Sequence, residues 1–153
     1  ADFDRCVMAM ALSHYLAFVG YLTVPALGPR FALEAQFSVE LRGLWLANPI
    51  HDALNFLEGI KRDAFPSGHT SVALLALYYA VRFTPRLVPV LAPGVFLMIL
   101  STMYLRYHYL VDVLAGAALA GLCVPLAALL MRLQARWSFP HPPPATPRRG
   151  GRS

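Results

Sequence analysis

Residues 108–131 read HYLVDVLAGAALAGLCVPLAALLM, and this stretch decides the fold class. Apart from His108, Tyr109 and Asp112 near its start, the stretch consists of apolar residues. A helix needs about 20 mostly apolar residues to cross the hydrocarbon core of a bilayer. The stretch therefore predicts a membrane-spanning helix that carries one carboxylate near its beginning.

Three further apolar runs, 6–27, 67–83 and 87–105, precede this stretch. Only 14% of the 153 residues are charged, whereas a soluble domain needs about 25% to cover its surface. Much of the surface must therefore face lipid rather than water. The sequence predicts an all-α protein, a polytopic transmembrane helical bundle with four spans in this chain.

The positive charge of the chain predicts its orientation. The formal net charge is +5. If the spans alternate in direction, one side of the membrane collects most of the arginines: Arg5, Arg82, Arg86, Arg132, Arg136, Arg148, Arg149 and Arg152. The positive-inside rule makes that side cytoplasmic. We interpret the charge as an orientation signal in a plasma (inner) membrane and expect no nucleic-acid partner.

Two segments lie outside the predicted spans. The external connection, 28–66, repeats apolar residues at helical spacing, which predicts an amphipathic interfacial helix: Leu33, Phe37, Leu41 and Leu44, with Trp45 as an anchor. Residues 132–153 are basic and rich in proline, so they predict a disordered cytoplasmic tail. The expected organisation is a membrane-embedded domain over 1–131 followed by this tail.

The first motif that carries chemistry is FPSGHT at residues 65–70. Ser67 is a favourable N-cap for the apolar helix that follows, and a helix N-terminus attracts anions. Lys61 and Arg62 add positive charge just upstream, and His69 could donate a proton beside a bound phosphate. The alternative interpretation is an ordinary capped helix start with an incidental histidine.

The second motif is HYLVD, which begins at His108 and ends at Asp112. Residues four apart share one face of a helix, so Asp112 can accept a hydrogen bond from a ring nitrogen of His108. This contact would fix the tautomer and leave the other nitrogen free to attack. The alternative is a structural His–Asp pair. His69 and His108 begin the second and fourth spans, and alternation places both at the outer face.

The paired motifs, residues 66–69 followed by His108 and Asp112, resemble the type 2 phosphatidic acid phosphatase (PAP2) superfamily over about residues 21–119. The resemblance implies a helical core that usually has six spans, so the four spans here would be a fragment of it. It also implies transfer or hydrolysis of phosphate esters through a phosphohistidine, with no metal and no cofactor. The domain over 1–131 would then be the catalytic domain.

The resemblance also assigns a role to each residue of the two motifs. His108 would be the nucleophile, Asp112 its partner, and His69 the general acid that protonates the leaving group. Ser67 and Gly68 would bind the phosphate.

The sequence departs from the family pattern at two places. Thr102 stands where the family has an arginine, and Arg106, one helical turn later, is a candidate substitute. The family's first motif is also absent. In its place, residues 25–30 (PALGPR) resemble the inositol phosphorylceramide synthase-like branch, which makes Arg30 a candidate phosphate ligand. An interfacial, snorkelling arginine is the alternative.

Three functional hypotheses follow from these residues. The first is a lipid phosphate phosphatase with water as the acceptor, which the PSGH motif favours. The second is a lipid phosphotransferase of the inositol phosphorylceramide synthase type that uses the same site. The third is a non-catalytic membrane bundle with a decayed site. The expected partners are a lipid phosphate substrate and membrane lipids, with the active site on the non-cytoplasmic face.

Overall fold

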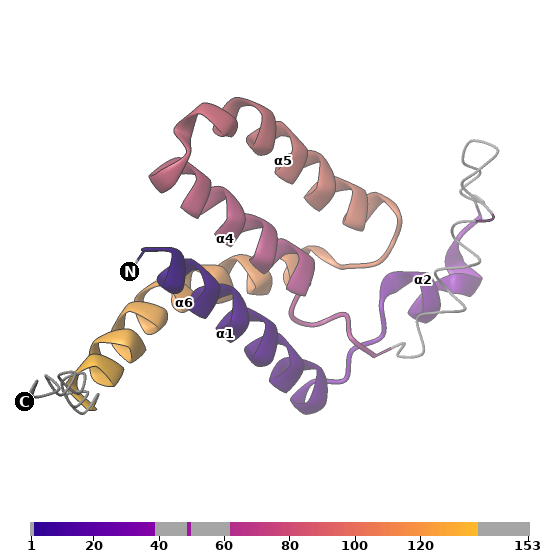
Figure 1. The fold of residues 1–153 in the computed structure, drawn as a ribbon. Coiled ribbons are helices and arrows are strands. Elements are labelled where there is room, and N and C mark those ends of the chain that lie inside the picture. The colour runs from indigo at the N-terminus through magenta and orange to yellow at the C-terminus, as the bar shows by residue number, and fades with distance from the viewer. Residues whose placement is uncertain (1, 39–48, 50–61, 138–153) are drawn as a thin grey trace, which may run out of the picture.

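The computed structural model describes residues 2–38, 49 and 62–137, and within them all regular structure is helical. The all-α prediction is confirmed. In chain order the elements are α1 (Asp2–Thr23), α2 (Pro29–Ala32), η1 (Glu34–Gln36), α4 (Gly68–Phe83), η2 (Pro85–Leu87), α5 (Val88–Tyr104) and α6 (Leu110–Trp137), as Figure 1 shows.

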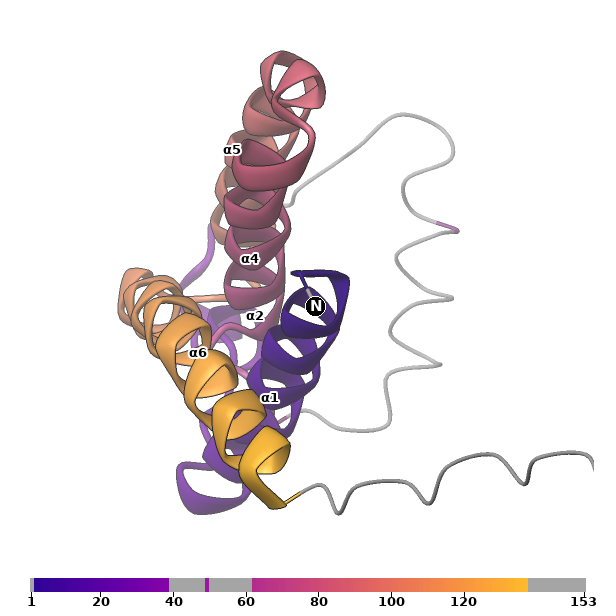
Figure 2. The same ribbon diagram turned by 60° about the vertical axis from the view of Figure 1, so that its left-hand side comes forward.

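Helix α4 is the centre of the bundle. It packs against α1, α5 and α6, and α1 also packs against α6, an arrangement visible in Figures 1 and 2. Small residues let helices in a membrane approach closely. Half of the residues in the buried core are alanines; the core consists of Ala9, Leu75, Tyr79, Ala120, Cys123 and Ala127. The bundle therefore depends on close packing of its backbones around α4.

Three helices among the described residues are long and apolar enough to cross a membrane: Asp2–Thr23, Pro85–Tyr104 and Leu110–Arg136. The sequence predicted a fourth span in the run 67–83. The corresponding helix α4 has 16 residues, which gives about 24 Å of helix against a hydrocarbon core of about 30 Å. Ser67 caps its start, and Pro85 lies just beyond its end.

Two hydrogen bonds fix how α1 runs beside α4. Ser13 and Ser71 share a buried hydrogen bond of 2.7 Å between their hydroxyl oxygens. The Tyr79 hydroxyl donates to the Arg5 carbonyl at 3.2 Å. The start of α1 therefore lies beside the end of α4, and the end of α1 lies beside the start of α4 (Figure 1).

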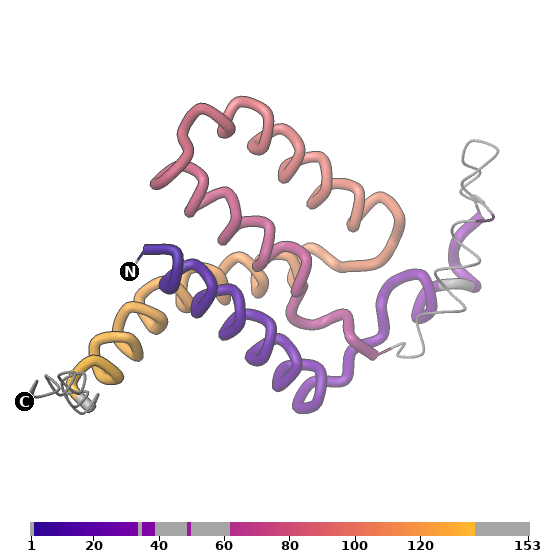
Figure 3. Tube along the Cα trace, viewed as in Figure 1, coloured from indigo at the N-terminus to yellow at the C-terminus, as the bar shows by residue number. Residues whose placement is uncertain are grey.

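The predicted segments outside the spans need one correction. Helix α6 continues to Trp137, so residues 132–137 are helical rather than part of the predicted tail. Leu133, Gln134 and Ala135 favour helix, which explains the longer element. Residues 138–153 lie outside the described part of the chain, as does most of the predicted interfacial helix (Figure 3). The described start of that segment holds only α2 and η1.

Candidate active site

A small pocket, partly open to solvent, lies at the end of the bundle where α4 starts. Three separate segments supply its chemistry. The segment after α1 contributes Arg30, α4 contributes His69, and the loop between α5 and α6 contributes His108. The helices thus bring together the residues that the two sequence motifs singled out.

The two histidines face the same pocket. Their ring centroids are 5.9 Å apart. His69 is exposed, whereas only 7% of the His108 surface is accessible. One ring is therefore held inside the protein and the other can meet a ligand or a leaving group that arrives from outside.

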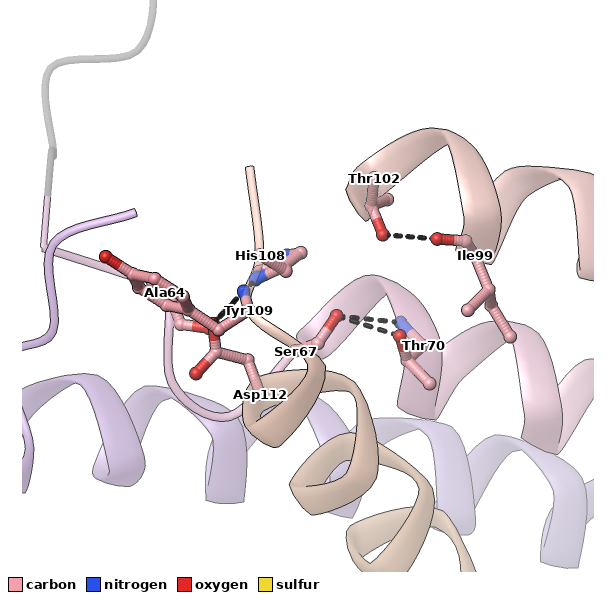
Figure 4. Close-up of polar contacts among 8 residues, drawn as sticks. All are labelled: Ala64, Ser67, Thr70, Ile99, Thr102, His108, Tyr109 and Asp112. Carbon is pink, nitrogen blue, oxygen red and sulfur yellow. Dashed lines mark hydrogen bonds and ion pairs between the residues drawn. The ribbon is translucent and has the colours of Figure 1, made fainter. Parts of the chain in front are cut away.

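The orientation of His108 is set by a backbone carbonyl. The His108 Nδ1 atom lies 2.9 Å from the carbonyl oxygen of Ala64, as Figure 4 shows. A carbonyl oxygen can only accept a hydrogen bond, so Nδ1 must carry the proton. In the neutral ring the lone pair then lies on Nε2, which is the atom available to attack phosphorus.

Asp112 has a different first partner from the one that the sequence predicted. Its Oδ2 atom accepts a hydrogen bond of 2.7 Å from the backbone N–H of Tyr109. The same oxygen is 3.8 Å from His108 Nδ1, which is beyond hydrogen-bond distance but close enough for charge attraction. The bond to Tyr109 closes the first turn of α6 in the manner of a capping box. The predicted hydrogen bond from His108 is therefore corrected to a longer contact, which becomes an ion pair only when the ring carries a positive charge.

Burial governs the protonation of His108. It lowers the pKa of the ring below its ordinary value of 6.5, while the hydrogen bond to Ala64 opposes this shift. The nearby His69 lowers the pKa further, and Asp112 raises it. The net direction keeps the ring neutral, which is the form that a nucleophile needs.

The start of α4 confirms one predicted contact. The Ser67 hydroxyl accepts a hydrogen bond of 3.3 Å from the backbone N–H of Thr70 and shares one of 2.9 Å with the Thr70 hydroxyl. Ser67 is therefore the N-cap that the sequence predicted. Its side chain is fully buried and does not line the pocket, so the contact shown for its hydroxyl is the helix cap.

Gly68 lies against Tyr21, which comes from the end of α1. The Tyr21 hydroxyl lies close to the Gly68 backbone. A Cβ atom on residue 68 would lie 2.7 Å from that hydroxyl oxygen. The glycine of the motif is therefore required for the close approach of α1.

Gly116 in α6 allows a second close approach. A Cβ atom there would collide with the carbonyl oxygen of Ser67. The Ser67 N–H in turn donates to the Asp112 carbonyl at 3.0 Å. The turn that precedes α4 is thus held directly on the first turns of α6, which fixes the spacing between the two histidines.

The basic candidates are separated by the structure. Arg30 lines the pocket, and its guanidinium lies 4.1 Å from the centre of the Tyr107 ring. The Arg106 guanidinium instead lies 3.6 Å from the centre of the Phe37 ring. Arg106 does not line the pocket, and its backbone has a φ of 63°.

Two further basic candidates lie elsewhere. Arg62 is exposed and does not line the pocket, and Lys61 lies outside the described residues. Thr102 donates to the carbonyl of Ile99 at 2.8 Å (Figure 4) and does not line the pocket either. Of the basic candidates within the described ranges, Arg30 is the one that the structure places in the pocket. Those ranges contain no group of three or more His, Cys, Asp or Glu side chains placed to hold a metal ion.

Comparison with known proteins agrees with these motifs. Residues 1–126 match the sequence profile of the PAP2 superfamily. This chain belongs to the PAP2 superfamily. A PA-phosphatase related-family protein of Dictyostelium discoideum is 26% identical over 115 residues, a segment that makes up 73% of this chain and 21% of the relative. The chain therefore spans about a fifth of the length of that relative. No solved structure matches this chain.

Sequence reasoning did not place Tyr21, Asp63 or Ala64 in the pocket of this PAP2 protein. Tyr21 and Asp63 line it, and Ala64 supplies the carbonyl that holds His108. From the sequence, the charge of Asp63 is explained as balancing Lys61 and Arg62, and that interpretation gives it no place in the pocket. Ala64 gives no sequence signal at all, because the contributing group belongs to the backbone.

Proposed function

We propose that this PAP2 protein is a membrane lipid phosphate phosphatase that works through a phosphohistidine on His108 and needs no metal. Membership of the superfamily supports a phosphatase-type function. The observation that carries the specific proposal is the approach of His69 and His108 to 5.9 Å in one pocket that Arg30 also lines. A nucleophile, a proton donor and a cation are the groups that phosphoryl transfer requires.

The proposed reaction has two displacements. In the first, His108 Nε2 forms a bond to phosphorus while the bond to the lipid alkoxide breaks, and His69 gives that alkoxide a proton. In the second, water attacks the phosphorus and the N–P bond breaks. His69 now takes a proton from the water, so the product leaves as inorganic phosphate from a monoester or as a phosphomonoester from a diester, and both histidines return to their starting forms. Arg30 would stabilise the charge on the phosphoryl oxygens.

The pH dependence of this reaction follows from the position of His108. Because only the neutral ring can attack, activity should fall as the pH drops through the pKa of His108. Burial lowers that pKa below 6.5. We therefore expect the acid limb of kcat/KM to lie below pH 6.5. The measurement should use a lipid phosphodiester, whose charge does not change in this range; a midpoint above 6.5 would contradict the assignment.

We also propose that the pocket faces the non-cytoplasmic side of a plasma (inner) membrane. The arginines at the ends of α4 and α6, such as Arg82 and Arg136, lie at the opposite end of these helices from the two histidines. The positive-inside rule assigns that opposite end to the cytoplasm.

Single cysteines can test this orientation. Ser38 and Thr84 are exposed and lie on the pocket side and the opposite side in the proposed topology. In a background of Cys6→Ser and Cys123→Ala, a membrane-impermeant maleimide should label Ser38→Cys in intact cells. Thr84→Cys should be labelled only after the membrane is permeabilised. Labelling of both positions from one side would contradict the topology.

The phosphotransferase remains a second candidate because of one observation. Gly28 and Arg30, from the segment that resembles the inositol phosphorylceramide synthase-like branch, both line the pocket. A transferase would use the same two histidines and replace water by a lipid or polyol hydroxyl in the second displacement.

Product analysis separates the two candidates. The purified protein is given a labelled lipid phosphate or phosphoinositide, with and without excess diacylglycerol, ceramide or inositol, in the presence of EDTA. We expect free phosphate as the main product, with no effect of the acceptor or the chelator. A phosphodiester product that dominates when acceptor is added would favour the transferase. Activity that EDTA removes and magnesium restores would contradict the metal-independent mechanism.

A further inference from the structure

Asp63 places a carboxylate in the pocket that we propose binds a negatively charged phosphate ester. It lines the pocket together with both histidines and is partly buried. Its charge acts on the His108 ring and on the Tyr21 hydroxyl. The mechanism above uses neither this charge nor its position.

Apart from its histidines, the described pocket lining holds one fixed charge of each sign. Arg30 and Asp63 carry these two charges. The positive charge of Arg30 is therefore offset by the negative charge of Asp63. The pocket is partly closed off from solvent, so water screens these charges less than it would at an open surface.

This balance treats the two ionic forms of a phosphate ester differently. A doubly charged monoester is repelled by Asp63 with twice the force that a singly charged ester meets. A protonated monoester can also donate its P–O–H group to the carboxylate as a hydrogen bond, whereas the dianion has no proton to donate. A carboxylate in this position thus favours one negative charge over two.

We propose that Asp63 is a specificity determinant that selects phosphate esters carrying a single negative charge. This inference rests on the proposed function. The substrate class is therefore a phosphodiester lipid at any ordinary pH, or a phosphomonoester lipid in its protonated form, which dominates below a pH of about 6.

The test compares a short-chain phosphomonoester with the phosphodiester of the same lipid, using the full chain in detergent. The ratio of their kcat/KM values is measured at pH 8, where the monoester is a dianion, and at pH 5. Tyr21, Arg30, His69 and His108 line the same pocket, so the ratio of each variant is compared with the wild-type ratio at the same pH.

The variant Asp63→Asn should raise the monoester-to-diester ratio by about tenfold at pH 8 and leave it near the wild-type value at pH 5. Asp63→Glu keeps the charge and should retain the wild-type ratio at both pH values. Asp2→Asn makes the same change in net charge at the exposed, far end of α1, so it too should retain the wild-type ratio. Asp63→Ser provides a second neutral variant if the asparagine protein does not fold.

Binding of inorganic phosphate gives a readout that does not depend on turnover. The dissociation constant of phosphate, measured by phosphorus NMR, should fall about tenfold at pH 8 in Asp63→Asn and change little at pH 5. The proposal would be overturned if both neutral variants kept the wild-type monoester-to-diester ratio and the wild-type phosphate affinity. It would also be overturned if kcat/KM fell equally for both substrates. If wild-type protein turns over neither ester, the proposed function fails, while the phosphate measurement still decides the role of Asp63.

Discussion

The variant His108→Ala is expected to have no measurable turnover, a fall of at least about 10⁴-fold. The Ala64 carbonyl holds the proton on Nδ1, so Nε2 is the attacking atom, and alanine removes it. Losing the nucleophile of a covalent mechanism leaves only the residual catalysis due to binding and charge stabilisation. Orthovanadate, which can adopt the five-coordinate geometry of the transition state, should inhibit wild-type protein.

A matched histidine makes this experiment specific. His14 lies in α1, is exposed and does not line the pocket, so His14→Ala should retain wild-type activity. Rapid quenching with a ³²P-labelled substrate should trap label on the wild-type protein and none on His108→Ala. Activity that survives in His108→Ala would rule out the phosphohistidine. Wild-type protein that is folded and inert toward every lipid phosphate would instead support the decayed, non-catalytic bundle.

The helices were predictable because the length of each apolar run can be counted in the sequence. The runs 6–27, 87–105 and 108–131 all became long helices, with boundaries that shifted by a few residues. The run 67–83 gave a helix that is short for a span, because the apolar run between Pro66 and Pro85 is itself short. Apolar composition marks a buried or lipid-facing segment, and the Ser67 cap that starts this helix was itself predicted from the sequence.

The pairing of the histidines was predictable for a different reason. Alternating helices must return to the same side of the membrane, so residues at the start of α4 and α6 share one end of the bundle. Which side chains then enter the pocket depends on local packing. The Arg106 guanidinium lies over the Phe37 ring, and Arg62 is exposed at the surface. Arg30 entered the pocket beside Tyr107, and no spacing rule distinguishes these three arginines.

The variant Asp112→Asn is expected to lose about 10²- to 10³-fold in turnover while its stability stays close to that of wild type. The carboxylate lies 3.8 Å from His108 Nδ1, where its charge would stabilise the positive ring of the phosphohistidine by a few kcal/mol, about 4 at an effective dielectric constant of 20. An amide removes this charge. Its oxygen can still accept the hydrogen bond from Tyr109, so the first turn of α6 should remain capped.

The expected loss of turnover in Asp112→Asn is smaller than the loss that a wrong tautomer of His108 would cause. In serine proteases, replacing the aspartate that holds the catalytic histidine costs about 10⁴ because the ring adopts the wrong tautomer. Here the Ala64 carbonyl imposes the tautomer whether residue 112 is charged or neutral. The deficit of Asp112→Asn should therefore appear in kcat, where the charged ring forms, and much less in KM.

Comparison with Asp112→Ala separates the charge from the cap. Alanine removes both the charge and the acceptor for the Tyr109 N–H, and the loss of a capping contact costs about 1 kcal/mol. Asp112→Ala should thus match Asp112→Asn in rate per folded molecule but unfold at a lower temperature. If Asp112→Asn instead retains a rate within threefold of wild type, the carboxylate serves only to cap α6, and His108 depends on Ala64 alone for its orientation.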